Sequence, residues 1–355
     1  MRILDFYIGR VIASTTFITL TVFVCVSGII KFVEQMRAIG RGDYDLAHAA
    51  LYVLYAIPRD VEIFFPMSAL IGGLVGIGML ASNSELVVMQ AAGLSRLDII
   101  KSVMKTAMLL ILISMAIGEW LAPSGEEKAR QIRAQAISGG SLISAKSGVW
   151  AKDGDYFVNI GEVLDRGQLK KIQIYGFNEE LKIDNWLTAK SAIYQENVWL
   201  LKDVEEFILK DYEITLKKYD QKVWQSSLTP KKLGVVTVTP ESLSLSGLVD
   251  YLDYLEANEQ DSSRYQLAFW RKIMQPFTVA VMLLVALSFI FGPLRSVSMG
   301  ARIMMGVFTG ILFFISNEIL GSLSLVYQLP PVLGATVPSL CFVGGAWYIM
   351  SKKPT

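Results

Sequence analysis

Six long apolar stretches, separated by polar segments, dominate the hydrophobic pattern of the 355-residue chain. Each approaches the roughly 20 mainly apolar residues that a helix needs to cross about 30 Å of hydrocarbon. The pattern therefore predicts spans near residues 11–33, 61–81, 101–122, 273–292, 302–326 and 332–350. Arg2 and Arg10 precede the first span, and no small-residue cleavage pattern follows it, which predicts a retained helix rather than a signal peptide.

A long polar stretch, residues 123–268, separates the third span from the fourth. From Gly148 onward, short runs rich in Val, Ile, Tyr, Phe and Trp alternate with turn residues, which is typical of antiparallel strands. The expected strands are 148–160, 171–177, 189–201, 207–216 and 221–228, with turns at 152–155, 165–167 and 178–180. The edges of such a sheet either pair with another protein's sheet or are blunted by Lys and Glu.

These patterns predict an α-helical membrane protein with six transmembrane helices plus an all-β, jelly-roll-like domain on the outer side of the membrane. The expected divisions are residues 1–122 with three spans, 123–268 outside the membrane with the β-domain near 148–230, and 269–355 with three spans. Basic residues are in excess in the short segments on the inner side, so both termini are expected in the cytoplasm. The opposite loop mixes bases with acids, including Arg59, Asp60 and Glu62, and bears little on orientation.

Composition supports a membrane location and excludes several chemistries. Hydrophobic residues make up 53% of the chain, mean hydropathy is +0.44, and charged residues make up 18%, against about 25% in soluble domains. A net charge of +1 gives no overall field for nucleic-acid binding. Cys25 and Cys341 lie in apolar runs and are expected as free, buried thiols, while the single histidine, His48, has no partners for a zinc site.

The segment between the second and third spans predicts a short, separately capped helix near residues 84–92. Its signals are a capping box of Ser82 with Glu85, a stop at Gly93, and a second capping box of Ser95 with Asp98. Leu86 and Met89 would give this helix an apolar face. Such a helix either lies on the lipid surface or docks to a soluble partner.

A glycine-rich run at residues 72–78 lies inside a span and is not followed by Lys-Ser or Lys-Thr, so it is not a phosphate-binding loop. Gly72 and Gly76 form a GxxxG pair, which predicts close helix packing. Because no nucleotide-binding motif occurs, the chain is not expected to be an enzyme, and any ATP is hydrolysed by a separate subunit.

Polar residues in and beside the spans are the candidate functional groups. Asn317 and Glu318 lie within the fifth span, where a structural helix contact and a functional role fit equally. Four basic residues are expected near the outer ends of the first and third spans, where they would suit the phosphates of an amphiphilic substrate. They are Lys31, Arg37, Arg130 and Arg133. For Lys31, simple snorkelling toward the interface is the alternative.

Several runs of residues resemble the G-type permeases of the lipopolysaccharide export system across nearly the whole chain. The runs are Gly28 to Val33, Ser84 to Gln90, Gly118 to Trp120, Trp150 to Gly154, Arg264 to Leu267 and Phe291 to Val297. The resemblance implies an inner-membrane permease with a periplasmic jelly roll that extracts lipopolysaccharide, with the first and fifth spans lining a gate. Implied partners are a homologous F-type permease, a dimeric cytoplasmic ATPase that uses ATP and Mg²⁺, and periplasmic jelly-roll bridge proteins with a membrane-anchored C-type component.

The same resemblance assigns roles to the candidate residues. Glu85, with Leu86 and Met89, falls in the helix that couples to the ATPase, and the four basic residues fall at positions near the lipopolysaccharide phosphates. Ala38 departs from the family pattern, which often has a second basic residue there, and Arg41 is a possible replacement. Two other hypotheses remain: a secondary transporter with Glu318 as a proton site, although no inverted repeat is visible, and a membrane-anchored scaffold.

Overall fold

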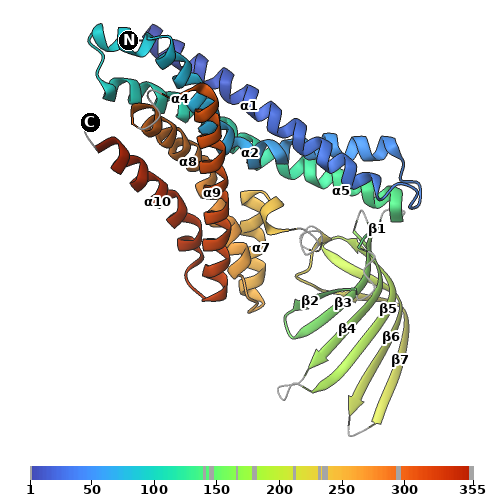
Figure 1. Cartoon of the computed structure of the whole chain (residues 1–355). Helices are drawn as coiled ribbons and strands as arrows, with labels where there is room; N and C mark the ends of the chain where they lie inside the picture. The colour runs from blue at the N-terminus through green and yellow to red at the C-terminus, as the bar shows by residue number, and fades with distance from the viewer. Residues whose placement is uncertain are drawn as a thin grey trace.

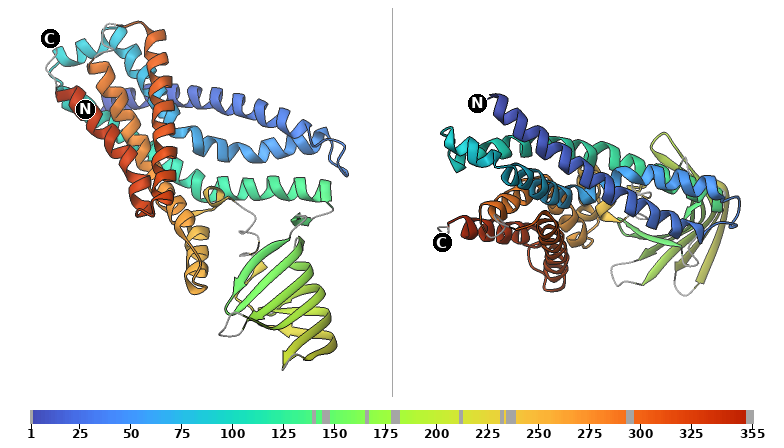
Figure 2. Two further views of the ribbon diagram at one scale, coloured as in Figure 1. Left: turned by 60° about the horizontal axis from the view of Figure 1, so that its bottom comes forward. Right: turned by 45° about the horizontal axis from the view of Figure 1, so that its top comes forward.

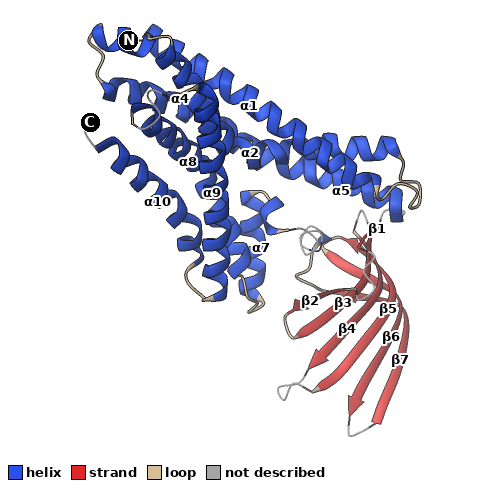
Figure 3. Ribbon diagram, in the orientation of Figure 1, coloured by secondary structure: helices blue, strands red, loops and turns tan. Residues whose placement is uncertain are grey.

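The structure is a computed structural model in which an elongated group of helices carries a separate curved β-sheet (Figure 1, Figure 3). It describes residues 2–138, 141–143, 148–164, 167–177, 182–210, 213–230, 233, 239–292 and 297–351. The expected turn at 178–180 and the motif residues 293–296 therefore lie outside the described residues.

Six helical stretches of the described chain are long and apolar enough to cross a membrane, as predicted. They are α1 (Arg2–Met36), α2 (Leu46–Ser82), α4 (Arg96–Ala116) with its continuation, α8 (Ser263–Phe291), α9 (Met299–Val326) and α10 (Pro331–Ser351). The continuation of α4 is a π-helix, η1 (Ile117–Leu121), followed by α5 (Ala122–Ser138). Together with the β-sheet, these helices confirm the predicted fold class.

Helix α2 begins well before the predicted second span. Asp45 caps its N-terminus by accepting a hydrogen bond from the backbone N–H of His48 at 2.9 Å. The prediction that Arg59, Asp60 and Glu62 belong to a loop is therefore wrong, because all three lie inside α2. Hydropathy failed here because two of the ion pairs that make these charges tolerable, Lys31–Asp60 and Lys272–Glu62, depend on how α2 packs against α1 and α8.

Helices α1 and α2 pack closely through the predicted glycine pair. A Cβ at Gly72 would collide with the backbone of Thr16, and a Cβ at Gly76 would come within 2.7 Å of Thr15 Oγ1. The Thr15 hydroxyl also donates to the Gly72 carbonyl at 2.7 Å. The GxxxG pair is thus a packing face, as predicted. Cys25 and Cys341 are free, as expected, but exposed on this chain, because the apolar runs around them do not face its interior.

Replacing Gly72 with alanine is expected to loosen α1 from α2. Overpacking of a close contact costs about 1–3 kcal/mol, so the melting temperature of the detergent-solubilised protein should fall. Gly344→Ala is the matched control, because a Cβ there meets nothing within 4 Å. Equal melting temperatures for the two variants would show that the α1–α2 contact tolerates the extra methyl group.

The sheet outside the spans is antiparallel and follows the chain in order. Its strands are β1 (Ser141–Ile143), β2 (Val149–Asp153), β3 (Tyr156–Leu164), β4 (Gln168–Phe177), β5 (Ile183–Gln195), β6 (Val198–Lys210) and β7 (Glu213–Trp224). The order in space is β1-β3-β4-β5-β6-β7, with β2 paired to β3. The sheet curves along its length (Figure 2), and the fully buried Trp199 donates its indole N–H to the Leu228 carbonyl at 2.7 Å.

Three predicted strands were wrong in their bounds, and one of them, 221–228, begins inside β7 and continues past its end at Trp224. The run 189–201 contains the hairpin turn between β5 and β6, where Glu196 and Asn197 have φ values of 49° and 64°. Because neither residue is glycine or proline, the pattern gave no turn signal, although Asn tolerates the left-handed conformation. The run 207–216 likewise includes the end of β6 and the start of β7. The turn at Gly154, with φ of 61°, is confirmed.

In the described part of the connection from the sheet to the membrane, two short helices have defined bounds. They are η2 (Pro240–Ser242) and α7 (Leu245–Ala257). Tyr251, Tyr254 and Leu255 of α7 are buried in the same core as the sheet residues. Helix α7 therefore packs on the sheet, and its N-terminal end lies beside the spanning helices (Figure 1).

Candidate functional site

A cavity of about 350 Å³ lies where the C-terminal end of α1 meets α5, and three arginines line it. Arg37 and Arg41 come from the turn after α1, and Arg133 comes from α5. The remaining lining residues are Glu34, Gln35 and Ala38. Three guanidinium groups around one cavity, with one carboxylate among the lining residues, suit the binding of an anionic group such as phosphate.

Local packing fixes the turn that carries two of these arginines. Tyr44 is 1% exposed and its hydroxyl donates to Gln35 Oε1 at 3.1 Å. The backbone N–H of Asp43 donates to the Ala136 carbonyl at 2.8 Å, which ties the turn to α5. Gly42 has φ of +56°, and a Cβ there would lie 2.6 Å from the same carbonyl oxygen, so only glycine fits.

Ala38, which stands where the family often has a second basic residue, is part of this packing. Ala38 is 4% exposed and lies in a small apolar cluster with Tyr44, Ala49 and Ala136. Position 38 therefore contributes to the contact beneath the cavity, and the third cation at the rim is Arg41.

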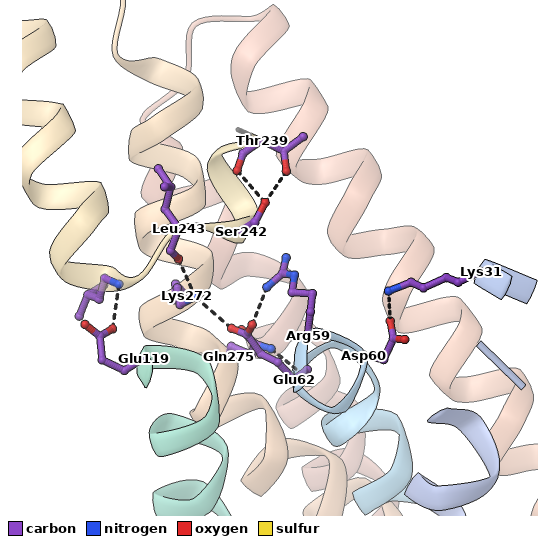
Figure 4. A network of polar contacts seen from close by, with 11 residues as sticks. Lys31, Arg59, Asp60, Glu62, Glu119, Thr239, Ser242, Leu243, Lys272 and Gln275 are labelled. Carbon is purple, nitrogen blue, oxygen red and sulfur yellow. Dashed lines mark hydrogen bonds and ion pairs between the residues drawn. The ribbon is translucent and has the colours of Figure 1, made fainter. Parts of the chain in front are cut away.

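The other two predicted basic residues lie beside this cavity but do not line it. Arg130 is one turn before Arg133 on α5, and its Nε donates to the Glu126 carbonyl at 3.4 Å, with the Glu126 carboxylate 3.9 Å away. Lys31 Nζ forms an ion pair with Asp60 Oδ1 at 2.7 Å, so α1 and α2 are joined there (Figure 4). The Asp60 side chain is 3% exposed, whereas Lys31 retains 27%.

The short helix predicted between the second and third spans is present as α3 (Glu85–Ala91), but one of its predicted caps is wrong. Ser82 ends α2 and donates to the Met79 carbonyl, while the N-cap of α3 is Ser84, with φ of 61° and no side-chain cap. The stop at Gly93 is confirmed, with φ of +95°. The second capping box, Ser95 with Asp98, is also confirmed.

The side chains of α3 divide into an inner and an outer face. Leu86 and Met89 are 6% and 8% exposed and belong to the main core of the membrane helices. Val87 and Val88 are 56% and 65% exposed, so they are the outward apolar residues. Glu85 accepts a hydrogen bond from the Tyr7 hydroxyl at 2.8 Å, which ties α3 to the start of α1.

The polar pair in the fifth span has a partner in the same chain. Arg271 of α8 lies with Nη1 3.2 Å from Glu318 Oε2, and its Nη2 donates to the Asn317 carbonyl at 2.7 Å. Gly321 leaves the space that the Arg271 guanidinium occupies. These contacts join α8 to α9, so the structural helix contact expected as one role for Asn317 and Glu318 is present.

The six apolar helices and the attached sheet define a multi-pass membrane protein with a β-domain. The chain belongs to the family described as the lipopolysaccharide export system permease LptF/LptG, whose pattern matches residues 6–352.

Two curated relatives show the same similarity over their full length. The chain is 50% identical over 355 residues to the lipopolysaccharide export system permease protein LptG of Escherichia coli strain K12, covering 99% of each chain. It is 49% identical over 352 residues to the protein of the same name from Haemophilus influenzae, covering 99% of this chain and 98% of the relative. A more distant similarity, 27% over 133 residues, links it to LptF of Escherichia coli K12.

Proposed function

We propose that this chain is the transmembrane subunit of an ATP-driven transporter that extracts lipopolysaccharide from the inner membrane and passes it toward a periplasmic bridge. The cavity of Arg37, Arg41 and Arg133 at the outer end of the membrane helices is the observation that carries this proposal. The family membership supports the same substrate, because lipopolysaccharide combines phosphate groups with acyl chains. ATP hydrolysis belongs to a separate subunit.

The arginine cavity would orient the substrate, and apolar surface would hold it. A charge-assisted hydrogen bond contributes about 1.5–3 kcal/mol, while burial of acyl chains contributes about 0.8 kcal/mol per CH₂ group. Exposed apolar side chains along α1 and α9, such as Phe17, Ile29 and Phe314, supply surface for acyl chains or for the partner permease. The arginines would therefore determine which lipid is selected more than how tightly it binds.

The proposed assembly pairs this chain with an F-type permease and with a dimeric cytoplasmic ATPase that uses ATP and Mg²⁺. Helix α3 is the proposed coupling helix, with Val87 and Val88 exposed, Glu85 half-buried at its first turn, and Leu86 and Met89 anchoring the helix in this chain's own core. Both termini are then cytoplasmic and the sheet is periplasmic. No nucleic acid and no resident cofactor enter this proposal.

The free edge of the sheet is the proposed contact with the bridge proteins, including a membrane-anchored C-type component. Strand β7 pairs only with β6 in the described chain, and nearly all of its side chains are exposed. An unpaired edge offers N–H and C=O groups that another strand can bind.

Photo-crosslinkers at Ile214 and Leu216 of β7 are expected to capture a bridge protein or lipopolysaccharide. Both side chains are exposed at this edge strand, at 60% and 46%. A crosslinker at Ile183 of β5, an interior strand with 41% exposure at that residue, is the matched control and should capture less. Equal capture at all three positions would argue against pairing through β7.

The function itself is tested by reconstituting the complex with lipopolysaccharide and varying the energy source. ATP with Mg²⁺ should drive release of lipopolysaccharide, and a proton ionophore should leave the release unchanged. Release driven by a proton gradient without ATP would support the secondary transporter, and no release under either condition would support the scaffold.

A further inference from the structure

A buried group of charges joins α2 to α8 beside the segment that precedes α7 (Figure 4). The Glu62 side chain of α2 is 2% exposed and accepts a hydrogen bond from Arg59 at 2.6 Å. Its other carboxylate oxygen lies 3.2 Å from Lys272 Nζ of α8, whose side chain is 10% exposed. Because an unpaired buried charge costs several kcal/mol, these contacts fix α2 against α8.

This group is distinct from the arginine cavity in its charge balance. The Lys272 ammonium interacts electrostatically with the carboxylates of Glu62 and Glu119 and with the guanidinium of Arg59. The two cations are therefore matched by two carboxylates. Because the positive and negative charges in this buried group are equal in number, the group does not favour binding of a phosphate. Its role is to hold the helices in place.

The π-helix η1 brings Glu119 from this region to the start of α7. Gly118 lies against Glu62, where a Cβ would come within 2.9 Å of Oε1. The Glu119 carboxylate accepts hydrogen bonds from the backbone N–H groups of Leu245 at 2.8 Å and Ser246 at 3.3 Å. These are among the first N–H groups of α7, which have no partner within the helix, and the helix dipole favours a negative charge there.

Lys272 holds the same segment from the other side. Its Nζ donates to the Leu243 carbonyl at 2.7 Å, just before α7 begins. Residues 243–246 are thus bound by a carboxylate on η1 and an ammonium on α8 (Figure 4). The attachment therefore depends on the positions of two spanning segments, η1 and α8.

The sheet is fixed to the same helix by separate contacts. The Tyr254 hydroxyl donates to the Lys152 carbonyl at 2.7 Å, and the backbone N–H of Gly154 donates to Asn258 Oδ1 at 2.9 Å. Burial, with the nearby Asp153 carboxylate, raises the pKa of Tyr254 to about 12, so the phenol remains a neutral donor. Helix α7 is therefore a short strut between the sheet and the spanning helices.

We propose that Glu119 and Lys272 are positioning residues that set the orientation of the β-sheet relative to the membrane helices. They act through α7, which connects the membrane helices to the sheet. A displacement of η1 relative to α8 then tilts the sheet toward or away from the outer end of the spans. The link to transport rests on the proposed function, in which the substrate leaves the membrane beside the sheet. The geometric part of the proposal is independent of the substrate.

The test compares Glu119→Gln with Glu127→Gln in the complete complex. Glu127 is the matched control because it lies on α5 and its carboxylate accepts from Gln131 of the same helix at 3.3 Å. Spin labels at Gln135→Cys on α5 and Lys217→Cys on β7, in a background with Cys25→Ala and Cys341→Ala, report the distance between helices and sheet. The second readout is ATP-driven transfer of lipopolysaccharide from proteoliposomes to a soluble bridge protein.

Glu119→Gln should broaden or shift the distance distribution and lower transfer threefold or more, with ATP hydrolysis unchanged. Lys272→Met should have the same effect, because it removes the hydrogen bond to the Leu243 carbonyl. Glu62 keeps its contact with Arg59 in this variant. Distance distributions that match the Glu127→Gln control in both variants would overturn the positioning role, and a changed distribution with normal transfer would overturn its link to transport. If the parent complex itself shows no transfer, the proposed function fails, while the distance measurement still decides the geometric part.

Discussion

Replacing Arg37 and Arg133 together by alanine is expected to slow ATP-driven release of lipopolysaccharide by about tenfold or more, since each lost charge-assisted contact is worth about 1.5–3 kcal/mol and 1.4 kcal/mol is a factor of ten. The two guanidinium groups line one cavity although they come from different segments. Assembly with the partner subunits and basal ATP hydrolysis should be unchanged, because neither residue belongs to α3 or to the buried helix contacts. Release rates from proteoliposomes measure the effect.

Lys128→Ala is the matched control for this double variant. It removes a cation from the same helix as Arg133, but the Lys128 ammonium lies over the Tyr55 ring, 5.7 Å from its centroid. A paired Arg130→Ala and Arg133→Ala variant should fall between the two, because Arg130 already contacts Glu126. If both double variants release lipopolysaccharide at the Lys128→Ala rate, the cavity does not bind the substrate's phosphates.

The structure changes how a Lys31 variant is interpreted. Because Lys31 pairs with the buried Asp60, Lys31→Asp places two carboxylates together and is expected to disturb the α1–α2 contact itself. Lys31→Gln removes the charge with a smaller disturbance. A loss of release with Lys31→Gln, at unchanged melting temperature, would assign Lys31 to the substrate path; a loss only with Lys31→Asp would assign it to packing.

Replacing Glu85 with alanine is the second change with a large expected effect. It should abolish most of the ATPase stimulation and lipid release, because α3 carries this one acidic residue, at the helix end where the dipole favours an acid. ATP hydrolysis and release by the reconstituted complex are the measurements. Gln90→Ala is the control, since Gln90 is exposed on the same helix.

Tyr7→Phe separates two explanations of the Glu85 effect. The Tyr7 hydroxyl is a hydrogen-bond donor to Glu85 within this chain, and phenylalanine removes it without changing the ring. If Glu85 acts by contacting the ATPase, Tyr7→Phe should retain most of the activity. An equal loss in both variants would place the role of Glu85 in the link between α3 and α1.

The sequence predicts the parts of this fold that depend on local patterns. Apolar length is enough to locate the six spans, and alternation identifies a β-domain, because both follow from one segment at a time. The hairpin at Glu196 and Asn197 was missed because its turn conformation has no glycine signal. The cap at Ser82 was wrong because α2 continues through that residue before α3 begins.

Some features of the candidate site were likewise predictable from the sequence, and others depend on how the helices pack. Topology alone brings Arg37 and Arg133 to the same end of the spans, and Arg41, expected as a possible replacement for the base missing at Ala38, lines the same cavity through the turn held by Tyr44. The Lys31–Asp60 and Glu62–Lys272 pairs depend on how distant helices pack, which no local pattern contains. The available signal was the cluster of charges at residues 59–62 in the middle of α2, which a hydrophobic span would exclude unless partners were present.

The most direct test of the account is transfer of lipopolysaccharide from proteoliposomes containing this chain, the F-type permease and the ATPase to a soluble periplasmic acceptor. Transfer should require ATP with Mg²⁺, should stop when the ATPase is replaced by a hydrolysis-deficient form, and should fall in the Arg37→Ala and Arg133→Ala double variant. Transfer that proceeds equally without ATP hydrolysis, or equally when this chain is left out, would contradict the account.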